Sequence, residues 1–165
     1  MKTIDIWIKA RQIAERVEHE TTVLALACKN RGQQQIYDNI IMDTDQLLNF
    51  RTYFKEAVAT VQDKCSPYTR HNRIPQGEDD QDTTRLDEDL YIILHMPDQF
   101  PDITAAAVDK AIYNYLIAWV IFRWLEVKLP QEAQPFRIRA EQNLSGLSSR
   151  LERRTTPLRR PYRLF

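Results

Sequence analysis

The side chains best suited to chemistry gather on one short stretch near the N-terminus. Glu15, Glu18, His19 and Glu20 place three carboxylates and an imidazole within about two helical turns, and such a set could bind a metal ion. Metal sites in helical bundles draw inward-facing Glu and Glu-x-x-His from several helices, and the sequence contains no Glu-x-x-His. Because Glu15 and His19 also lie beside the apolar stripe of their predicted helix, we expect a solvated face here.

No other catalytic or cofactor signature is present in the sequence. His71 and His95 lack neighbours at metal-ligand spacing. The nucleophile-elbow, zinc-protease, phosphate-loop and dinucleotide-binding motifs are missing, and three glycines in the whole chain argue against a glycine-rich phosphate loop. We therefore predict a protein that is not an enzyme, with no cofactor, no metal and no small-molecule substrate.

The elements that would carry these side chains belong to a chain of ordinary domain size. The 165 residues are 43% hydrophobic and 28% charged, which is typical of one globular domain. Lys and Arg number 23, as do Asp and Glu, so the formal net charge is zero. A uniformly basic nucleic-acid binder is excluded by that balance.

Hydrophobic periodicity predicts four principal helices. Apolar or small residues recur at steps of three and four over residues 4–31, 44–65, 103–128 and 135–154. Asp43 followed by Gln46 resembles a capping box at the start of the second helix. Pro135 marks the expected start of the fourth, because proline is tolerated in a first turn but breaks a helix interior.

Two shorter stretches are apolar without helical periodicity. Residues 36–42 are too few to distinguish strand from helix. Residues 90–96 have high β-propensity between Asp89 and Pro97, and we predict that they pair with residues 68–74 in a small ribbon around an acidic loop, 75–89. The expected fold class is mainly α, with a single helical domain over 1–154 and an extended basic tail over 155–165.

The third predicted helix is apolar around nearly its whole circumference. Between residues 111 and 125 only Asn114 and Arg123 are clearly polar, but the stretch is shorter than the ~20 residues that a bilayer crossing needs. A central helix, covered by the other helices or by another subunit, is the expectation. Its aromatic residues are at the spacing of packing side chains, and Tyr113 and Trp124 are predicted to pack in an oligomer.

The two cysteines and the N-terminus point to an intracellular protein. Cys28 and Cys65 lie on separate predicted helices outside any Cys-x-x-Cys pair, so we expect buried, reduced thiols rather than a disulfide. The first residues run directly into amphipathic sequence without an apolar signal region, and no secretion signal is expected.

Charge is strongly segregated along the chain. Residues 71–102 carry nine acidic side chains against two arginines, and residues 146–165 carry six arginines against one glutamate. The basic tail could dock on the acidic loop of a neighbouring subunit, it could face nucleic-acid phosphates, or both segments could be merely soluble ends. The predicted partner-binding residues are Arg150, Arg153, Arg154, Arg159, Arg160 and Arg163, with Glu78, Asp79, Asp80 and Asp82.

Several segments of the second half, with an alanine- and aromatic-rich helix, a short break and an arginine-rich end, form a recognisable pattern. They are Tyr91–Phe100, Val108–Leu116, Arg123–Leu125, Glu132–Ala133 and Arg153–Arg160. The pattern resembles small structural proteins encoded in phages and prophages of Bacteroidetes-type bacteria, and in outline it is similar to the head-tail connector (neck adaptor) proteins of tailed phages. The resemblance covers mainly residues 90–160, and Pro135 and the long acidic loop depart from the compact connector pattern.

The resemblance implies a non-enzymatic virion assembly protein. Such a subunit forms a ring between portal and tail, binds copies of itself and other virion proteins, and is found in the bacterial cytoplasm during assembly and then in the virion. In a ring each subunit offers one surface and receives another, which an acidic loop and a basic tail would fit. The alternative is a helical binding module, regulatory or nucleic-acid-associated, that uses its arginine-rich tail; neither expectation involves a membrane.

Overall fold

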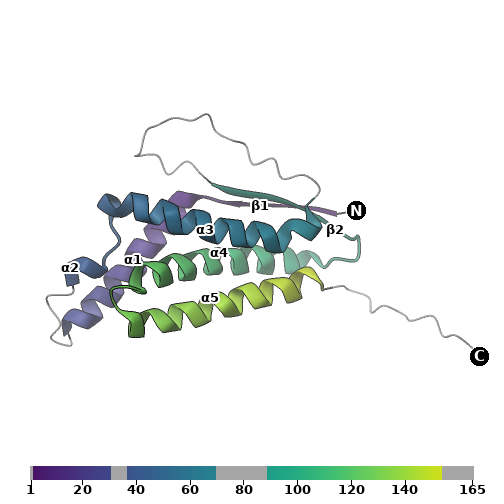
Figure 1. Ribbon diagram of the computed structural model, residues 1–165. Helices are drawn as coiled ribbons and strands as arrows, with labels where there is room; N and C mark the ends of the chain where they lie inside the picture. Colours follow the sequence, from purple (N-terminus) through teal and green to yellow (C-terminus); the bar gives the residue numbers. More distant parts are fainter. Residues whose placement is uncertain (1, 31–36, 70–88, 154–165) are drawn as a thin grey trace, which may run out of the picture.

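The computed structural model describes residues 2–30, 37–69 and 89–153 (Figure 1). In chain order the elements are β1 (Lys2–Ile8), α1 (Ala10–Asn30), α2 (Tyr37–Ile40), a 3-10 turn (Thr44–Gln46), α3 (Leu47–Cys65), a second 3-10 turn (Ser66–Tyr68), β2 (Leu90–Met96), α4 (Asp102–Leu125) and α5 (Pro130–Leu151). The predicted fold class is confirmed, since the protein is mainly helical with four principal helices and one two-stranded antiparallel sheet.

The sheet joins the N-terminus to the middle of the chain. β2 lies where the strand was predicted, but its partner is β1, with Ile6 opposite Ile92 and Trp7 opposite Tyr91. The start predicted for the partner strand is corrected, since Tyr68 ends a 3-10 turn. Residues 70–74 lie outside the described part of the chain, so their predicted pairing with β2 stays a prediction.

The first helix begins at Ala10, not at residue 4 as predicted. Residues 2–8 alternate between an inner face with Ile6 and Ile8, 1% and 3% exposed, and an outer face with Trp7. That period of two is the pattern of a half-buried strand. Ile6 also stands four positions before Ala10, so the helical stripe extends backward through the strand without a break in spacing, and this caused the error.

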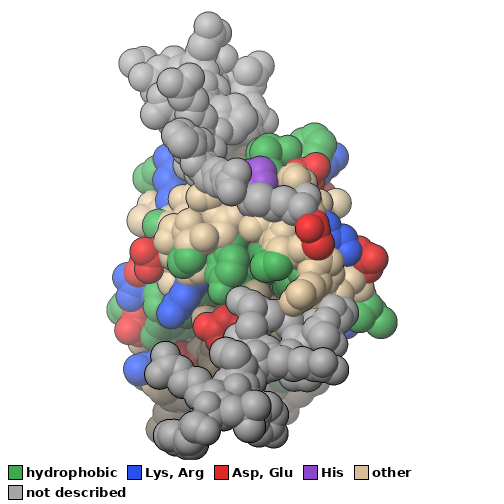
Figure 2. All heavy atoms as spheres, turned by 90° about the vertical axis from the view of Figure 1, so that its right-hand side faces the viewer, with side chains coloured by type: hydrophobic (Ala, Val, Ile, Leu, Met, Phe, Trp, Pro, Cys, Tyr) green, Lys and Arg blue, Asp and Glu red, His purple; other side chains and the backbone are tan. Residues whose placement is uncertain are grey.

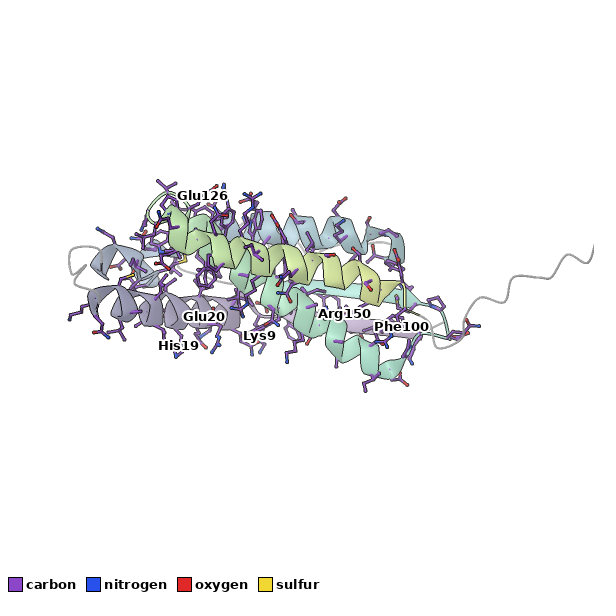
Figure 3. The ribbon with its side chains drawn as sticks, turned by 90° about the horizontal axis from the view of Figure 1, so that it is seen from below. Lys9, His19, Glu20, Phe100, Glu126 and Arg150 are labelled. Atoms are coloured by element: carbon purple, nitrogen blue, oxygen red, sulfur yellow. The ribbon has the colours of Figure 1, made fainter. Side chains whose placement is uncertain are left out.

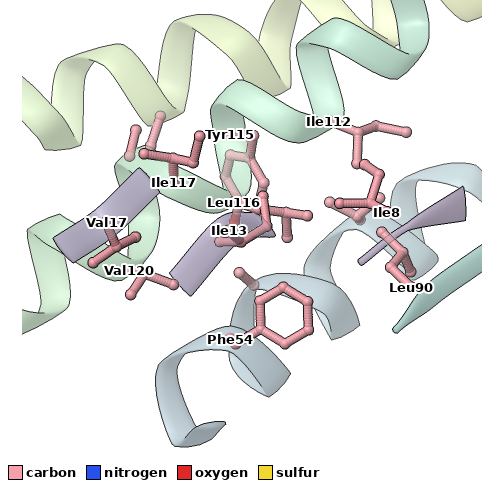
Figure 4. Close-up of a cluster of buried hydrophobic side chains, with 14 of the residues drawn as sticks. Ile8, Ile13, Val17, Phe54, Leu90, Ile112, Tyr115, Leu116, Ile117 and Val120 are labelled. Atoms are coloured by element: carbon pink, nitrogen blue, oxygen red, sulfur yellow. The ribbon is translucent and has the colours of Figure 1, made fainter. Parts of the chain in front are cut away.

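α4 is the centre of the molecule. It contacts α1, α3 and α5, and α3, α4 and α5 lie side by side while α1 runs obliquely to them (Figure 1). Figure 4 shows Ile112, Tyr115 and Leu116 of this helix facing side chains of the sheet, α1 and α3. α4 is the one helix of the described residues long and apolar enough to cross a membrane, and 56% of its apolar window is buried inside the protein. Packing within the fold accounts for that apolar surface.

α5 begins at Pro130, five residues earlier than predicted, and Pro135 lies inside it. Pro130 occupies the first turn, where proline is well tolerated, and the Ala133 amide donates to the Leu129 carbonyl oxygen at 3.0 Å. Ala133, Ala140 and Leu147 are fully buried along one face of the helix. The packing of this face on α4 outweighs the one backbone hydrogen bond that Pro135 cannot donate.

α3 starts within three residues of its predicted start, and the stretch that could not be assigned contains the four-residue helix α2. The predicted capping box does not form at the start of α3: Asp43 caps the preceding 3-10 turn by accepting a hydrogen bond from the Asp45 amide at 3.1 Å, and Gln46 Oε1 accepts one from Asn49 Nδ2 instead of from Asp43. Cys28 and Cys65 are free and buried, as predicted, and burial raises the pKa of the Cys65 thiol to about 11.

Candidate functional site

The two-stranded sheet has one buried face and one outward face. Alternation along the paired strands puts six residues on the outward face, which we call the outer sheet face. They are Thr3, Asp5, Trp7, Tyr91, Ile93 and His95. Trp7 and Tyr91 stand directly opposite each other, with 63% and 38% of their surfaces exposed. A pair of exposed aromatic side chains is typical of a surface that contacts a partner.

Asp89 fixes the position of Trp7. Its Oδ2 accepts a hydrogen bond from Trp7 Nε1 at 3.0 Å, and its Oδ1 accepts one from the Ala10 amide at 2.9 Å. The same carboxylate thus satisfies a backbone donor at the start of α1, where negative charge is favoured by the helix dipole. Lys9 Nζ lies 5.4 Å from the centroid of the Trp7 ring, within cation–π range. Trp7 is therefore exposed and yet held in place, the condition under which an aromatic anchor loses little entropy on binding.

Two of the four residues of the candidate metal cluster on α1 form ion pairs, while Glu18 and His19 are exposed. Glu15 pairs with Arg11 at 3.0 Å, while Glu20 pairs with Arg16 and with Arg139 of α5, each at 3.1 Å. Figure 3 shows His19 and Glu20 along α1, away from Arg150 on α5. In the described ranges no three Asp, Glu, His or Cys side chains come close enough to hold a metal ion.

A shallow depression of about 250 Å³ lies between α1 and the start of α3. Glu15 and Glu18 stand on its α1 side and Asp43 on the other, and the apolar side chains of Met42 and Phe50 also line it. Two of its three carboxylates have other partners: Glu15 binds Arg11, and Asp43 caps the turn before α3. We assign no chemistry to this depression.

The described part of the basic segment ends at Arg153. The guanidinium of Arg150 folds back over Gly146, where a Cβ atom would lie 3.0 Å from Arg150 Nη1. Nη1 is buried and has no hydrogen-bond partner in the described ranges. Arg154, Arg159, Arg160 and Arg163 lie outside those ranges, as does the acidic set at 78–82. Contact between the arginine-rich set and the acidic set of a neighbouring subunit therefore stays a prediction.

The two residues predicted to pack in an oligomer lie in different surroundings. Trp124 is only 5% exposed in the single chain. Its Nε1 donates to the Ile40 carbonyl oxygen at 2.6 Å, and Lys128 Nζ lies 3.2 Å from its ring centroid; burial there lowers the pKa of Lys128. Trp124 thus packs within its own subunit. Tyr113 is partly buried and packs against the core from α4.

The outer sheet face was missed in the sequence because β1 was read as helix. The signal was present, since apolar Ile4, Ile6 and Ile8 alternate with Thr3, Asp5 and Trp7. The contact of Asp89 with Ala10 spans 79 positions, and no local pattern reveals such a contact. Figure 2 looks onto the end of the molecule where β1 begins, and shows hydrophobic side chains scattered among charged ones of both signs there.

Comparisons with known proteins add no family to these observations. No protein-family model matches the chain, and neither the curated proteins nor the solved structures contain a match.

Proposed function

We propose that the protein is a non-enzymatic assembly protein that works by self-association, as a head-tail connector or neck-adaptor subunit of a tailed phage or prophage. The observation that carries the self-association is Trp7, a large aromatic side chain 63% exposed and held in place by Asp89 and Lys9. Residues of this type, exposed and already ordered, are the ones that contribute most at protein interfaces. The connector assignment rests on the resemblance of residues 90–160.

The distribution of charge supports the same function. Several described carboxylates of α1, α3 and α5 pair with arginines on the surface: Glu15 with Arg11, Glu56 with Arg123, and Glu141 with Arg137. Side chains engaged in this way stabilise helices and their packing. The unbalanced charges of the chain lie in two segments, the acidic residues 71–102 and the arginine-rich residues 146–165. In a ring, the basic segment of one subunit could bind the acidic segment of the next.

Co-expression with the portal protein encoded nearest to the gene tests this function. We expect the two proteins to copurify, and negative-stain images to show rings or portal-bound density. A chain that neither self-associates nor binds that portal contradicts the proposal. The reading frames beside the gene give an independent check, since portal, capsid and tail genes are expected there.

One observation favours the alternative, a binding module for an anionic partner such as nucleic acid. Arg150 Nη1 is a buried donor without a partner in the described ranges, one turn before the arginine-rich end. Arginine is suited to bidentate contacts with phosphate. This alternative predicts binding to DNA that weakens steeply with salt, and titration of a labelled duplex at several salt concentrations separates it from the connector proposal.

A further inference from the structure

β1 is an edge strand with an unusual pattern of charge. It pairs with β2 on one side, and no described strand lies on its other side. Backbone N–H and C=O groups on such an edge can pair with a strand of another chain. Asp5 and Trp7 occupy alternate positions of β1. Lys9 follows directly after the strand, where its carbonyl oxygen accepts hydrogen bonds from the Gln12 and Ile13 amides at the start of α1, and its Nζ lies close enough to the Trp7 ring to place both side chains on the same face.

Neither charge of this triplet, Asp5 or Lys9, is engaged in an ion pair with a described residue, and among those residues the Lys9 ammonium contacts only the Trp7 ring. Both charged side chains are exposed. An acid, an aromatic residue and a base at equal spacing form a sequence that is complementary to its own reverse. In an antiparallel pair of two such strands centred on Trp7, each Asp5 faces Lys9 of the other strand.

We propose that β1 pairs antiparallel with β1 of a second copy of the chain, centred on Trp7, so that residues 6–8 of the two strands join their sheets in the order β2, β1, β1, β2. Trp7 then stands opposite Trp7 of the partner subunit, and Ile6 stands opposite Ile8 of the partner subunit on the inner side. Two Asp5–Lys9 pairs flank the tryptophans. The contact is isologous, because the same strand is offered by both subunits.

The charges favour this register over the others that keep the isoleucines on the inner face. Only a pair centred on Trp7 sets Asp5 opposite Lys9, whereas a pair centred on Ile6 sets Asp5 opposite Trp7 and gains no ion pair. A pair centred on Asp5 would set the two Asp5 carboxylates directly opposite each other, and like charges in cross-strand positions are destabilising. A pair with one strand shifted by a single residue would place the inner isoleucines of that strand on the outer face. The self-complementary pattern also favours a second copy over an unrelated antiparallel strand, which would have to supply the same order of acid, aromatic residue and base along its own chain.

The inference rests on the proposed self-association and specifies the contact that Trp7 makes, which differs from the contact between neighbours in a ring. A ring requires a head-to-tail contact between different surfaces, whereas β1 pairing is two-fold. Subunits could therefore pair through β1 and still use their charged segments for neighbours in a ring.

Exchange of the two charges tests the pairing directly. Asp5→Lys and Lys9→Glu each replace two opposite-charge pairs of the dimer with two like-charge pairs, and each is expected to weaken dimerisation about tenfold in sedimentation velocity. When the two variants are mixed, the lysine introduced at position 5 of one chain faces the glutamate introduced at position 9 of the other. The unchanged Lys9 of the first chain faces the unchanged Asp5 of the second, so the heterodimer is expected to associate as tightly as the original chain.

The matched controls are Glu18→Lys on α1 and Lys110→Glu on α4, both exposed and away from the sheet. These variants have the same net charges as the test pair, so a general attraction between oppositely charged proteins would affect both mixtures. We expect each control to dimerise like the original chain and their mixture to show only the statistical share of heterodimer.

Cross-linking checks the register with a second readout. A mixture of Asp5→Cys and Lys9→Cys chains is expected to form a disulfide-linked heterodimer under mild oxidation, at least several times faster than Asp5→Cys alone, while buried Cys28 and Cys65 stay unreacted. Wild-type association that is unaffected by either charge change, or a mixture no tighter than its components, overturns β1 pairing and leaves the proposed function standing. Failure to bind the portal, with β1 pairing intact, overturns the connector function alone.

Discussion

Trp124 Nε1 donates a hydrogen bond to the Ile40 carbonyl oxygen at 2.6 Å, and this contact joins α4 to α2 across 84 positions of sequence. Both residues are buried, at 5% and 0% exposure. When the donor of a buried hydrogen bond is removed, the acceptor left without a partner lowers the stability of the fold. Replacing Trp124 therefore distinguishes packing inside the subunit, which changes stability, from packing between subunits, which changes association.

Trp124→Phe should lower the free energy of unfolding by roughly 1–3 kcal/mol, because the Ile40 carbonyl oxygen loses its buried partner. Urea unfolding followed by circular dichroism measures the loss, and Trp7→Phe, on the exposed sheet face, should stay within about 0.5 kcal/mol of the original chain. Association measured by sedimentation should not change with Trp124→Phe. A variant of full stability with weakened association would place Trp124 at a subunit interface instead.

Removal of the Asp89 carboxylate should destabilise the start of α1 and release Trp7. Asp89→Ala is expected to cost about 0.5–2 kcal/mol, the usual range for a lost helix cap, and to shift the fluorescence of Trp7 toward that of a more mobile indole. Asp5→Ala serves as the control, since it removes an exposed carboxylate from β1, the strand that carries Trp7. Equal stability of the two variants would show that the hydrogen bonds of Asp89 to Ala10 and Trp7 contribute nothing.

Of the α1 carboxylates in ion pairs, Glu20 should contribute most to the free energy of unfolding. Its side chain is 15% exposed and meets Arg16 and Arg139, whereas Glu15 is 63% exposed and meets Arg11 alone. Glu20→Gln is expected to cost about 0.5–1.5 kcal/mol and Glu15→Gln less than about 0.5. High salt should narrow the difference by screening; the idea fails if thermal melts rank the two variants in the opposite order.

Pro135 should be a weak point of α5. Pro135→Ala restores a backbone donor inside the helix and is expected to raise stability by about 1–3 kcal/mol. Pro130→Ala, in the first turn, should leave stability unchanged or slightly lower. A loss of stability on Pro135→Ala, measured by the urea midpoint, would mean that the proline side chain itself contributes to the packing of α5.

The Cys65 thiol should stay protonated and unreactive in the folded protein over the ordinary pH range. Burial raises its pKa from 9.0 to about 11, so the unfolded chain loses this proton first as pH rises. The stability that depends on the neutral thiol is complete below pH 9 and is lost as pH rises toward 11. A thiol reagent at about pH 8, below the usual thiol pKa, should label Cys65 only after denaturant is added, and rapid labelling of the native chain would contradict this.

Local patterns predicted the helices well and the contacts between distant segments poorly. The apolar residues of α3 and α4 recur at helical spacing, so their bounds were close to those observed. Pro135 misled because tertiary packing of Ala133 and Ala140 overrides a local preference. The partner of β2 could not be found, since antiparallel pairing specifies a face and a register but not which distant segment supplies the second strand.

The outer sheet face around Trp7 could not be predicted either, because it also depends on contacts between distant segments. Trp7 lies opposite Tyr91, a residue far along the chain, and is held by Asp89. Within the sequence Trp7 stands in a stretch whose isoleucine spacing also suits a helix. The ion-pair partners at spacing four, such as Arg137 and Glu141, were the kind of contact that sequence does reveal.

Sedimentation velocity of the full chain over a wide range of concentration, alone and with the portal protein, tests the central claim most directly. Self-association predicts a species heavier than the 19.5 kDa monomer, with a share that grows with concentration, and a complex with the portal. A single 19.5 kDa monomer at every concentration, unchanged when the portal is added, would contradict a self-associating assembly protein.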